Sequence, residues 1–126
     1  MSTRGNICIK VKEKDFEFVE DTIDEKISES SPYLFIYNHF DSYPEGLGEN
    51  LIKNYNDYEA ALDLVLDGDC STPGVPYAVR EGYSHTKPRV VSNIAQANQE
   101  EYLYVFDEGW KCYDDSLELK EIPNDL

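Results

Sequence analysis

The stretch from Tyr37 to Glu45 carries alternating side chains that could do chemistry, namely phenols, an imidazole and carboxylates. In an extended chain every second side chain points to the same face, so we expect Tyr37, His39 and Asp41 on one side. Tyr43 and Glu45 follow in what we expect to be a turn. An imidazole beside a carboxylate is the arrangement of an oriented general base, and the same groups together with phenols can bind a polar ligand.

Arg4 is a further candidate near this stretch. If the first strand pairs with the strand that holds His39, the guanidinium reaches the same side. It would then neutralise Asp41 or Glu45, or offer two parallel donors to an anionic ligand. Simpler roles stay open, because Glu45 could only cap a helix, His39 could be a half-buried structural histidine and Arg4 an ordinary surface residue. We predict no catalytic residue, and a ligand-binding set of Arg4, Tyr37, His39, Asp41, Tyr43 and Glu45.

Other chemistries find little support in the sequence. It contains no glycine-rich dinucleotide loop, no Walker loop, no paired-histidine zinc motif and no serine-hydrolase elbow. His39 and Asp41 could ligate a metal, but two histidines with scattered acids are too few to predict a metal site. The three cysteines stand apart without a fixed His or Asn partner, so they indicate no clear thiol nucleophile. We expect no cofactor.

The strand that must position these groups is the run from Tyr33 to Phe40. Both of its faces are largely apolar, which is typical of a strand covered on both sides, or covered on one side and lining a pocket on the other. The first strand, residues 7–12, alternates Ile and Val with Cys8 and two lysines. We therefore expect one buried face and one wetter face, with Arg4 and Asn6 on the wetter side.

We expect helices in the segments that precede and follow this strand in the sequence. Residues 13–31 hold eight acids and two lysines, with apolar residues at helical spacing, which predicts a short amphipathic helix or, alternatively, a mobile acidic loop. Residues 42–45 fit a capping box with Ser42 as the N-cap, although the helix could begin only at Gly48. Asn56–Glu59 signals a second start, and Gly68 a stop.

The second half of the chain is predicted to be mainly strands. We expect a loop over residues 69–76, short strands at 77–80 and 88–91 around a turn, and a helical turn or loop over 93–101. The strongest hairpin signal is 102–113, followed by an acidic tail, 114–126. The order of elements predicts an α+β fold, with a mainly antiparallel sheet and two or three helices packed on one face. We expect a single domain over residues 1–126, with acidic segments at 13–31 and 114–126.

The composition of the chain limits the kinds of partner that it can bind. The 126 residues include 26 acids and 11 basic residues, for a net charge of -15. Direct binding to nucleic-acid phosphates and to anionic membranes is disfavoured, whereas a basic protein partner fits the charge. An odd number of cysteines, no apolar targeting segment and no long apolar run favour a cytoplasmic protein that does not cross a membrane.

Two blocks of the chain are similar to a group of small phage and bacterial proteins. These proteins share a Thr-Arg-Gly-Asn start, here Thr3–Asn6, and a Tyr-x-His-x-Asp-x-Tyr-Pro-Glu-Gly motif, here Tyr37–Gly46. A Tyr-rich hairpin near the end, like that after Glu101, often accompanies them. The resemblance implies a phage or mobile-element origin more than an activity, and it groups the same residues that strand alternation selects.

From these patterns we expect a phage-type accessory protein that binds without catalysis and antagonises host defence. It would sequester a small polar ligand, such as a nucleotide, at the end of the central strand in the host cytoplasm, and a homo-oligomer could complete the pocket. One alternative is an acidic nucleic-acid mimic that blocks a basic host protein. Others are a phosphoester hydrolase that uses His39 and Asp41, and a purely structural domain.

Overall fold

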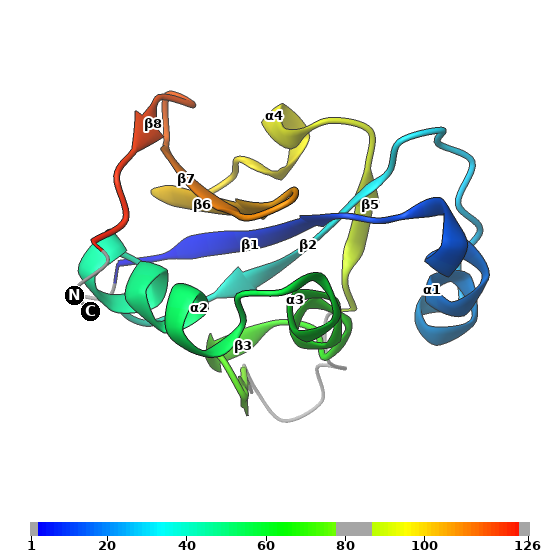
Figure 1. Cartoon of the computed structure of the whole chain (residues 1–126), viewed down its shortest axis with the longest axis horizontal. Coiled ribbons are helices and arrows are strands. Elements are labelled where there is room, and N and C mark those ends of the chain that lie inside the picture. Colours follow the sequence, from blue (N-terminus) through cyan, green and yellow to red (C-terminus); the bar gives the residue numbers. More distant parts are fainter. Residues whose placement is uncertain (1–2, 78–86, 124–126) are drawn as a thin grey trace.

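The computed structural model describes residues 3–77 and 87–123, which build one mixed sheet with helices on both of its faces (Figure 1). The strand order is β4-β3-β2-β1-β6-β7-β8, and β5 pairs with β2 beside β3. The strands are β1 (Gly5–Lys10), β2 (Tyr33–Asn38), β3 (Cys70–Thr72), β4 (Val75–Pro76), β5 (Arg89–Val91), β6 (Tyr102–Phe106), β7 (Trp110–Asp114) and β8 (Leu119–Lys120).

The predicted α+β class and mainly antiparallel pairing are confirmed, with two exceptions in the sheet. β1 runs parallel to β6, and β2 runs parallel to β3, while the other pairs are antiparallel. The parallel pair of β1 and β6 arises because β6 enters the sheet on the free edge of β1 after a long excursion of the chain. The carboxyl-terminal ends of β1 and β6 therefore lie side by side.

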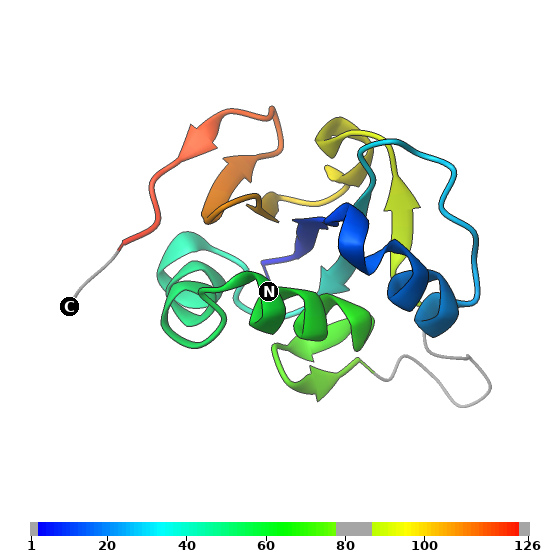
Figure 2. The ribbon, with the colours of Figure 1, turned by 45° about the vertical axis from the view of Figure 1, so that its right-hand side comes forward.

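Three α-helices cover one face of the sheet and a fourth lies on the other (Figure 2). The helical segments are η1 (Glu13–Asp15), α1 (Phe16–Ile23), η2 (Pro44–Gly48), α2 (Glu49–Asn54), α3 (Tyr58–Leu66) and α4 (Ile94–Ala97). The prediction of helices on one face only is wrong, because α4 packs Ala97 and Ile94 against the opposite face. No helix in the described part of the chain is long and apolar enough to span a bilayer.

The first strand is buried on both faces, which corrects the expectation of a wetter side. Cys8 has no exposed surface and Asn6 is 2% exposed. Phe35, Leu103 and Val105 surround Cys8, and Ala97 closes this second core. Asn6 is satisfied there, because its amide nitrogen donates to Ile36 O at 3.3 Å and its Oδ1 accepts from Gln99 N at 3.2 Å.

The acidic segment 13–31 is helical over its first part only. α1 presents Val19 and Ile23 to the core and ends where Asp24 takes a left-handed conformation, φ 56°. The irregular stretch that follows is tied back, because Ile27 N donates to Glu20 Oε2 at 2.7 Å. The amphipathic helix is thus confirmed for Phe16–Ile23, and no helix continues to residue 31.

The two expected helix starts have different outcomes. The helix α3 begins within Asn56–Glu59 as predicted, and its N-cap is Asp57, whose carboxylate accepts from Ala60 N at 2.8 Å. The capping box at Ser42 is wrong, because Ser42 is fully buried and its hydroxyl bonds to Asn38 instead. Tyr43 precedes a π-helical turn that begins at Pro44, and this turn leads directly into α2.

In the second half the hairpin is confirmed and the loop is corrected. β6 and β7 pair as expected, from Tyr102 opposite Asp114 to Phe106 opposite Trp110. The expected loop at 69–76 forms the small β3–β4 hairpin, and the acidic tail contributes β8. Of the strands expected at 77–80 and 88–91, β5 forms and pairs with β2, whereas residues 78–86 lie outside the described part of the chain.

Candidate functional site

The chain beyond β2 stays extended because it continues to pair with β3. His39 N donates to Cys70 O at 3.0 Å, and Phe40 N donates to Ser71 O at 2.9 Å. The alternation of β2 therefore extends past its last residue, Asn38, and carries His39 to the same face as Tyr37. The chain then bends at Asp41, whose backbone is left-handed with φ 54°.

Three aromatic rings surround the imidazole at this end of the sheet. The Tyr37 hydroxyl and His39 Nδ1 lie 2.8 Å apart and form a hydrogen bond. The Tyr77 ring meets the imidazole nearly perpendicularly with centroids 4.6 Å apart, and the Phe40 ring does so at 4.5 Å. Tyr37 and Tyr77 also contact each other at 5.5 Å. We call Tyr37, His39, Phe40 and Tyr77 the aromatic platform; edge-to-face contacts of this kind stabilise ring pairs beyond their buried area.

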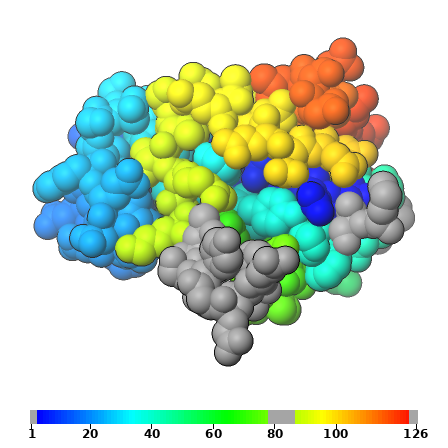
Figure 3. Space-filling view, turned by 180° about the vertical axis from the view of Figure 1, so that it is seen from behind, coloured from blue at the N-terminus to red at the C-terminus, as the bar shows by residue number. Residues whose placement is uncertain are grey.

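An arginine from β5 lies beside the platform on the same face. The Arg89 guanidinium stacks over the Phe35 ring, 4.7 Å from its centroid, and its Nη2 donates to Asp69 Oδ1 at 2.9 Å. The same carboxylate oxygen accepts from Tyr37 N at 2.9 Å, so Asp69 ties β5 to β2. Arg89 Nε is buried and has no hydrogen-bond partner among the described residues. Figure 3 views the molecule from behind Figure 1, where the cyan surface of β2 lies beside the yellow-green of β5 and the blue of β1 lies between β2 and β6.

Arg4 lies at the same end of the sheet as His39. The antiparallel register pairs Gly5 with Asn38, which brings the residue before Gly5 to the end of β2. Burial raises the pKa of Tyr37, and the positive charge of Arg4 opposes that rise. The register and the electrostatics thus both place Arg4 near Tyr37, whereas no ion pair between described residues joins Arg4 to Asp41 or Glu45, the partners expected from the sequence.

The other three predicted residues lie in the turn that follows. Asp41 and Glu45 are exposed, as is Tyr43, and the Asp41 carbonyl accepts from Leu47 N at 2.9 Å. The negative charge of Glu45 helps to raise the pKa of Tyr104, whose side chain belongs to the core on the opposite face. Among the described residues, His39 bonds to the Tyr37 hydroxyl and not to Asp41. The structure therefore groups Arg4, Tyr37 and His39, and leaves Asp41, Tyr43 and Glu45 along the turn.

A buried polar network holds this turn in place. Asn38 Nδ2 donates to Ser42 Oγ at 2.8 Å and to Phe40 O at 2.9 Å, and its Oδ1 accepts from Cys70 Sγ at 3.2 Å. The Tyr104 hydroxyl donates to Ser42 O at 2.6 Å. Asn38 and Ser42 have no exposed surface, so each of these bonds replaces water that neither residue can reach.

Sequence reasoning missed half of the platform and its neighbours. Strand alternation would place Phe40 on the face opposite His39, and Asp69 was expected only in a loop. Tyr77 and Arg89 come from segments more than 30 residues away along the chain, and nothing in their local sequence points to the end of β2. The one usable signal was that Arg89 belongs to a short run of strand-forming residues.

Comparison with known proteins adds no family to this geometry. No family model matches the chain, and no curated protein or solved structure matches it either. Within residues 3–77 and 87–123, no group of three His, Cys, Asp or Glu side chains is placed to hold a metal ion.

Proposed function

We propose that this protein is a non-enzymatic binding protein whose aromatic platform takes a small polar ligand with a planar ring, such as a nucleotide. The observation that carries the proposal is the gathering of three rings and an imidazole at the surface end of β2, with Phe40 44% exposed. Stacking of a base on an aromatic side chain contributes about 1–3 kcal/mol. Arg4 supplies positive charge at the edge of the platform for the anionic part of the ligand, whereas the charge of Arg89 is already paired with Asp69.

Binding is favoured over hydrolysis by the partner of the imidazole. A histidine base is normally oriented by a carboxylate, as the pairing of His39 with Asp41 would have provided. The hydroxyl of Tyr37 occupies His39 Nδ1 instead. A neutral phenol positions the ring without stabilising an imidazolium charge, which suits recognition better than proton transfer.

The biological role in this proposal rests on the resemblance of residues 3–6 and 37–46 to small phage and bacterial proteins. A protein of that origin that sequesters a nucleotide signal in the host cytoplasm would antagonise a defence system that depends on the signal. The expected result is restored phage growth when the protein is expressed in a bacterium that carries such a system. A variant without the platform, His39→Ala with Tyr77→Ala, would fail to restore it.

Ligand binding itself is tested by thermal unfolding in the presence of linear and cyclic mononucleotides. A ligand that binds only the folded state raises the melting temperature. We expect one nucleotide class to do so, and Phe40→Ala and Tyr77→Ala to remove the shift. Phe18→Ala is the matched control, because Phe18 is an exposed ring, 55% accessible, on α1 and away from the platform. Absence of a shift with every nucleotide would refute the proposal.

A second candidate is an acidic mimic of nucleic acid, favoured by the open hollow along η1 and α1. Six carboxylates line this hollow, together with two lysines: Glu13, Glu17, Glu20, Asp21, Asp24, Glu25, Lys14 and Lys26. Spaced carboxylates can occupy the groove of a basic protein and steer its approach. This function predicts that Glu17→Gln with Asp21→Asn abolishes capture of the host protein, whereas His39→Ala leaves it unchanged.

A further inference from the structure

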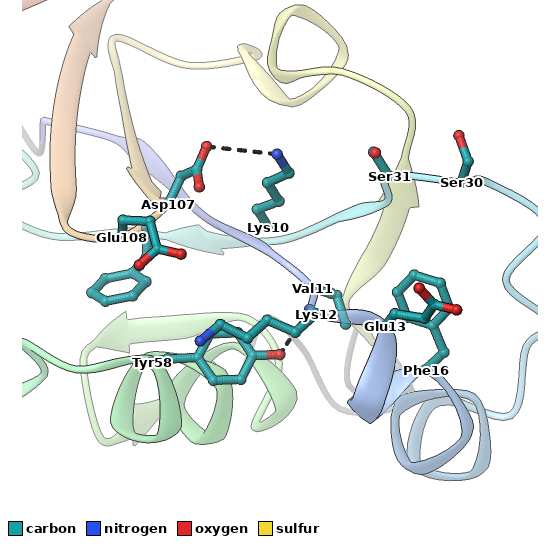
Figure 4. A pocket seen from close by; sticks show the side chains of 11 residues that line it. Lys10, Val11, Lys12, Glu13, Phe16, Ser30, Ser31, Tyr58, Asp107 and Glu108 are labelled. Atoms are coloured by element: carbon teal, nitrogen blue, oxygen red, sulfur yellow. Dashed lines mark hydrogen bonds and ion pairs between the residues drawn. The ribbon is translucent and has the colours of Figure 1, made fainter.

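A separate pocket lies at the opposite end of the sheet from the aromatic platform. It has a volume of about 390 Å³ and opens where the parallel strands β1 and β6 both end (Figure 4). Pockets that bind small ligands begin at about 300 Å³, so this volume suits a compact molecule. Crevices beyond the carboxyl ends of parallel strands are also a recurrent place for ligands.

Two lysines from the end of β1 reach this pocket. The Lys12 side chain crosses the ring of Tyr58, with Nζ 4.6 Å from the centroid, as Figure 4 shows. The backbone nitrogen of Lys12 donates to the Tyr58 hydroxyl at 2.9 Å, which fixes the ring beneath the ammonium group. Lys10 lies 4.0 Å from Asp107, the outer limit of an ion pair. None of the ion pairs between described residues includes Lys12, so its ammonium is available to an anion.

The remaining wall is apolar and aromatic. Phe106 and Tyr58 line the pocket beside the lysines, and Phe16 lines it from the start of α1. A ring or branched apolar group placed against these side chains would be removed from water while its charged end meets Lys12. An ammonium that forms no ion pair with a described residue, next to an aromatic wall, suits an amphipathic anion as the ligand.

Acidic residues at the rim limit the charge that the ligand can carry. Glu13, Asp107 and Glu108 line the pocket with the lysines, and the chain as a whole has a net charge of -15. A polyphosphate or a nucleic acid would be repelled by this surrounding, whereas a single negative charge can be compensated locally by Lys12.

We propose that the pocket between the ends of β1 and β6 binds a small monoanionic acid with an aromatic body, with its carboxylate on Lys12 and its ring against Phe106 and Tyr58. This site is independent of the aromatic platform, because the two share no residue and lie at opposite ends of β1. Lys10 adds positive potential from the same strand end.

Titration with phenylacetate, followed by amide chemical shifts of the full-length protein, tests this site. We expect saturable shifts at residues 10–13, 58 and 106–108. A charge-assisted hydrogen bond contributes enough that Lys12→Gln should weaken binding about tenfold or more. Glu108→Gln should strengthen binding, because it removes a repelling charge from the rim. Lys111→Gln, which changes an exposed lysine that does not line the pocket, should leave the affinity unchanged.

Two further ligands test whether the pocket requires a negative charge and whether it prefers one charge to two. Phenylacetamide has the same ring without the charge, and phenyl phosphate carries a second negative charge near neutral pH. Both should bind more weakly than phenylacetate. Equal binding of phenylacetamide, an unchanged affinity in Lys12→Gln, or no saturable shift at the pocket residues would each overturn the assignment.

Discussion

At the scale of single residues, Asn38 connects more of the turn after β2 than any other side chain described there. Its amide group bonds to Ser42, to the Phe40 carbonyl and to Cys70 in a site closed to water. Asn38→Ala leaves these partners buried and unsatisfied, so we expect the free energy of unfolding to fall by about 2 kcal/mol. Urea denaturation measures this change. Asn54→Ala, which removes an exposed bond to Asn50, should change the free energy by less than about 0.5 kcal/mol.

Gly46, the last residue of the Tyr37–Gly46 motif, occupies a position that has no room for a side chain. A Cβ atom at this position would lie 2.5 Å from the Asp41 carbonyl oxygen, which is already engaged by Leu47 N. Because a backbone oxygen cannot move aside cheaply, Gly46→Ala should lower the free energy of unfolding by about 1–3 kcal/mol. Gly48→Ala is the control, since its Cβ would meet the movable side chain of Ile122 at 2.9 Å. A smaller loss in Gly46→Ala than in Gly48→Ala would contradict this account of the turn.

At the scale of elements, α3 depends on its first-turn contact as well as on its buried stripe. The Asp57 carboxylate accepts from Ala60 N and so satisfies one of the amide groups that the helix leaves open at its start. We expect Asp57→Ala to cost about 1 kcal/mol of unfolding free energy, measured by chemical denaturation. Asp63→Ala replaces an exposed acid within the same helix and should be nearly neutral. Equal effects of the two substitutions would rule out the cap as the cause.

The elements show why some of the fold could be read from the sequence and some could not. The start of α3 within Asn56–Glu59 and the hairpin at 102–113 were predicted correctly, because the signals for each lie within a few residues of one another. Ser42 misled because its hydroxyl bonds backward to Asn38, a partner that no helix rule considers. The β3–β4 hairpin was missed because strands of two or three residues are too short to show a period of two.

The candidate site also contains residues that the local sequence predicted and residues that it did not. Tyr37 and His39 were placed together by strand alternation, which is local and holds as long as the chain stays extended. The bend at Asp41 ends that alternation, and no residue type near it announces a left-handed backbone for an aspartate. The neighbours Tyr77 and Arg89 depend on how distant strands pair, which a single sequence does not specify.

At the scale of the whole molecule, three of the eleven basic residues lie at the two ends of β1. Arg4 lies at one end of β1 near the aromatic platform, and Lys10 and Lys12 lie at the other end beside the pocket. The acidic hollow along α1 adjoins the pocket end, because Glu13 and Phe16 line both. A strongly negative chain with cations beside aromatic side chains at two separate places offers a small anion two approaches that do not meet carboxylates alone.

The three cysteines and the buried tyrosines make the whole fold sensitive to alkali. All three thiols are buried, and burial raises the pKa of Cys112 from 9.0 to about 11 and that of Cys70 to about 12. Burial likewise raises the pKa of Tyr58 from 10.0 to about 12. Since the folded chain holds these protons more tightly than the unfolded chain, their contribution to stability is complete below about pH 9 and is lost as the pH rises through about 11–12. Urea denaturation at increasing pH should show this decline.

Thiol labelling separates this cause from general charge repulsion in a chain of this acidity. If the raised pKa values arise from burial, a disulfide reagent at mildly alkaline pH should label the native thiols far more slowly than the thiols of the protein in urea. In the native protein the reagent cannot reach the sulfur atoms, and the thiols stay protonated. Cys112→Ala should also flatten the loss of stability above pH 9, since it removes one proton that the folded state retains. Native thiols that react as fast as unfolded ones, or an unchanged slope in Cys112→Ala, would assign the alkaline loss to repulsion among the acidic side chains instead.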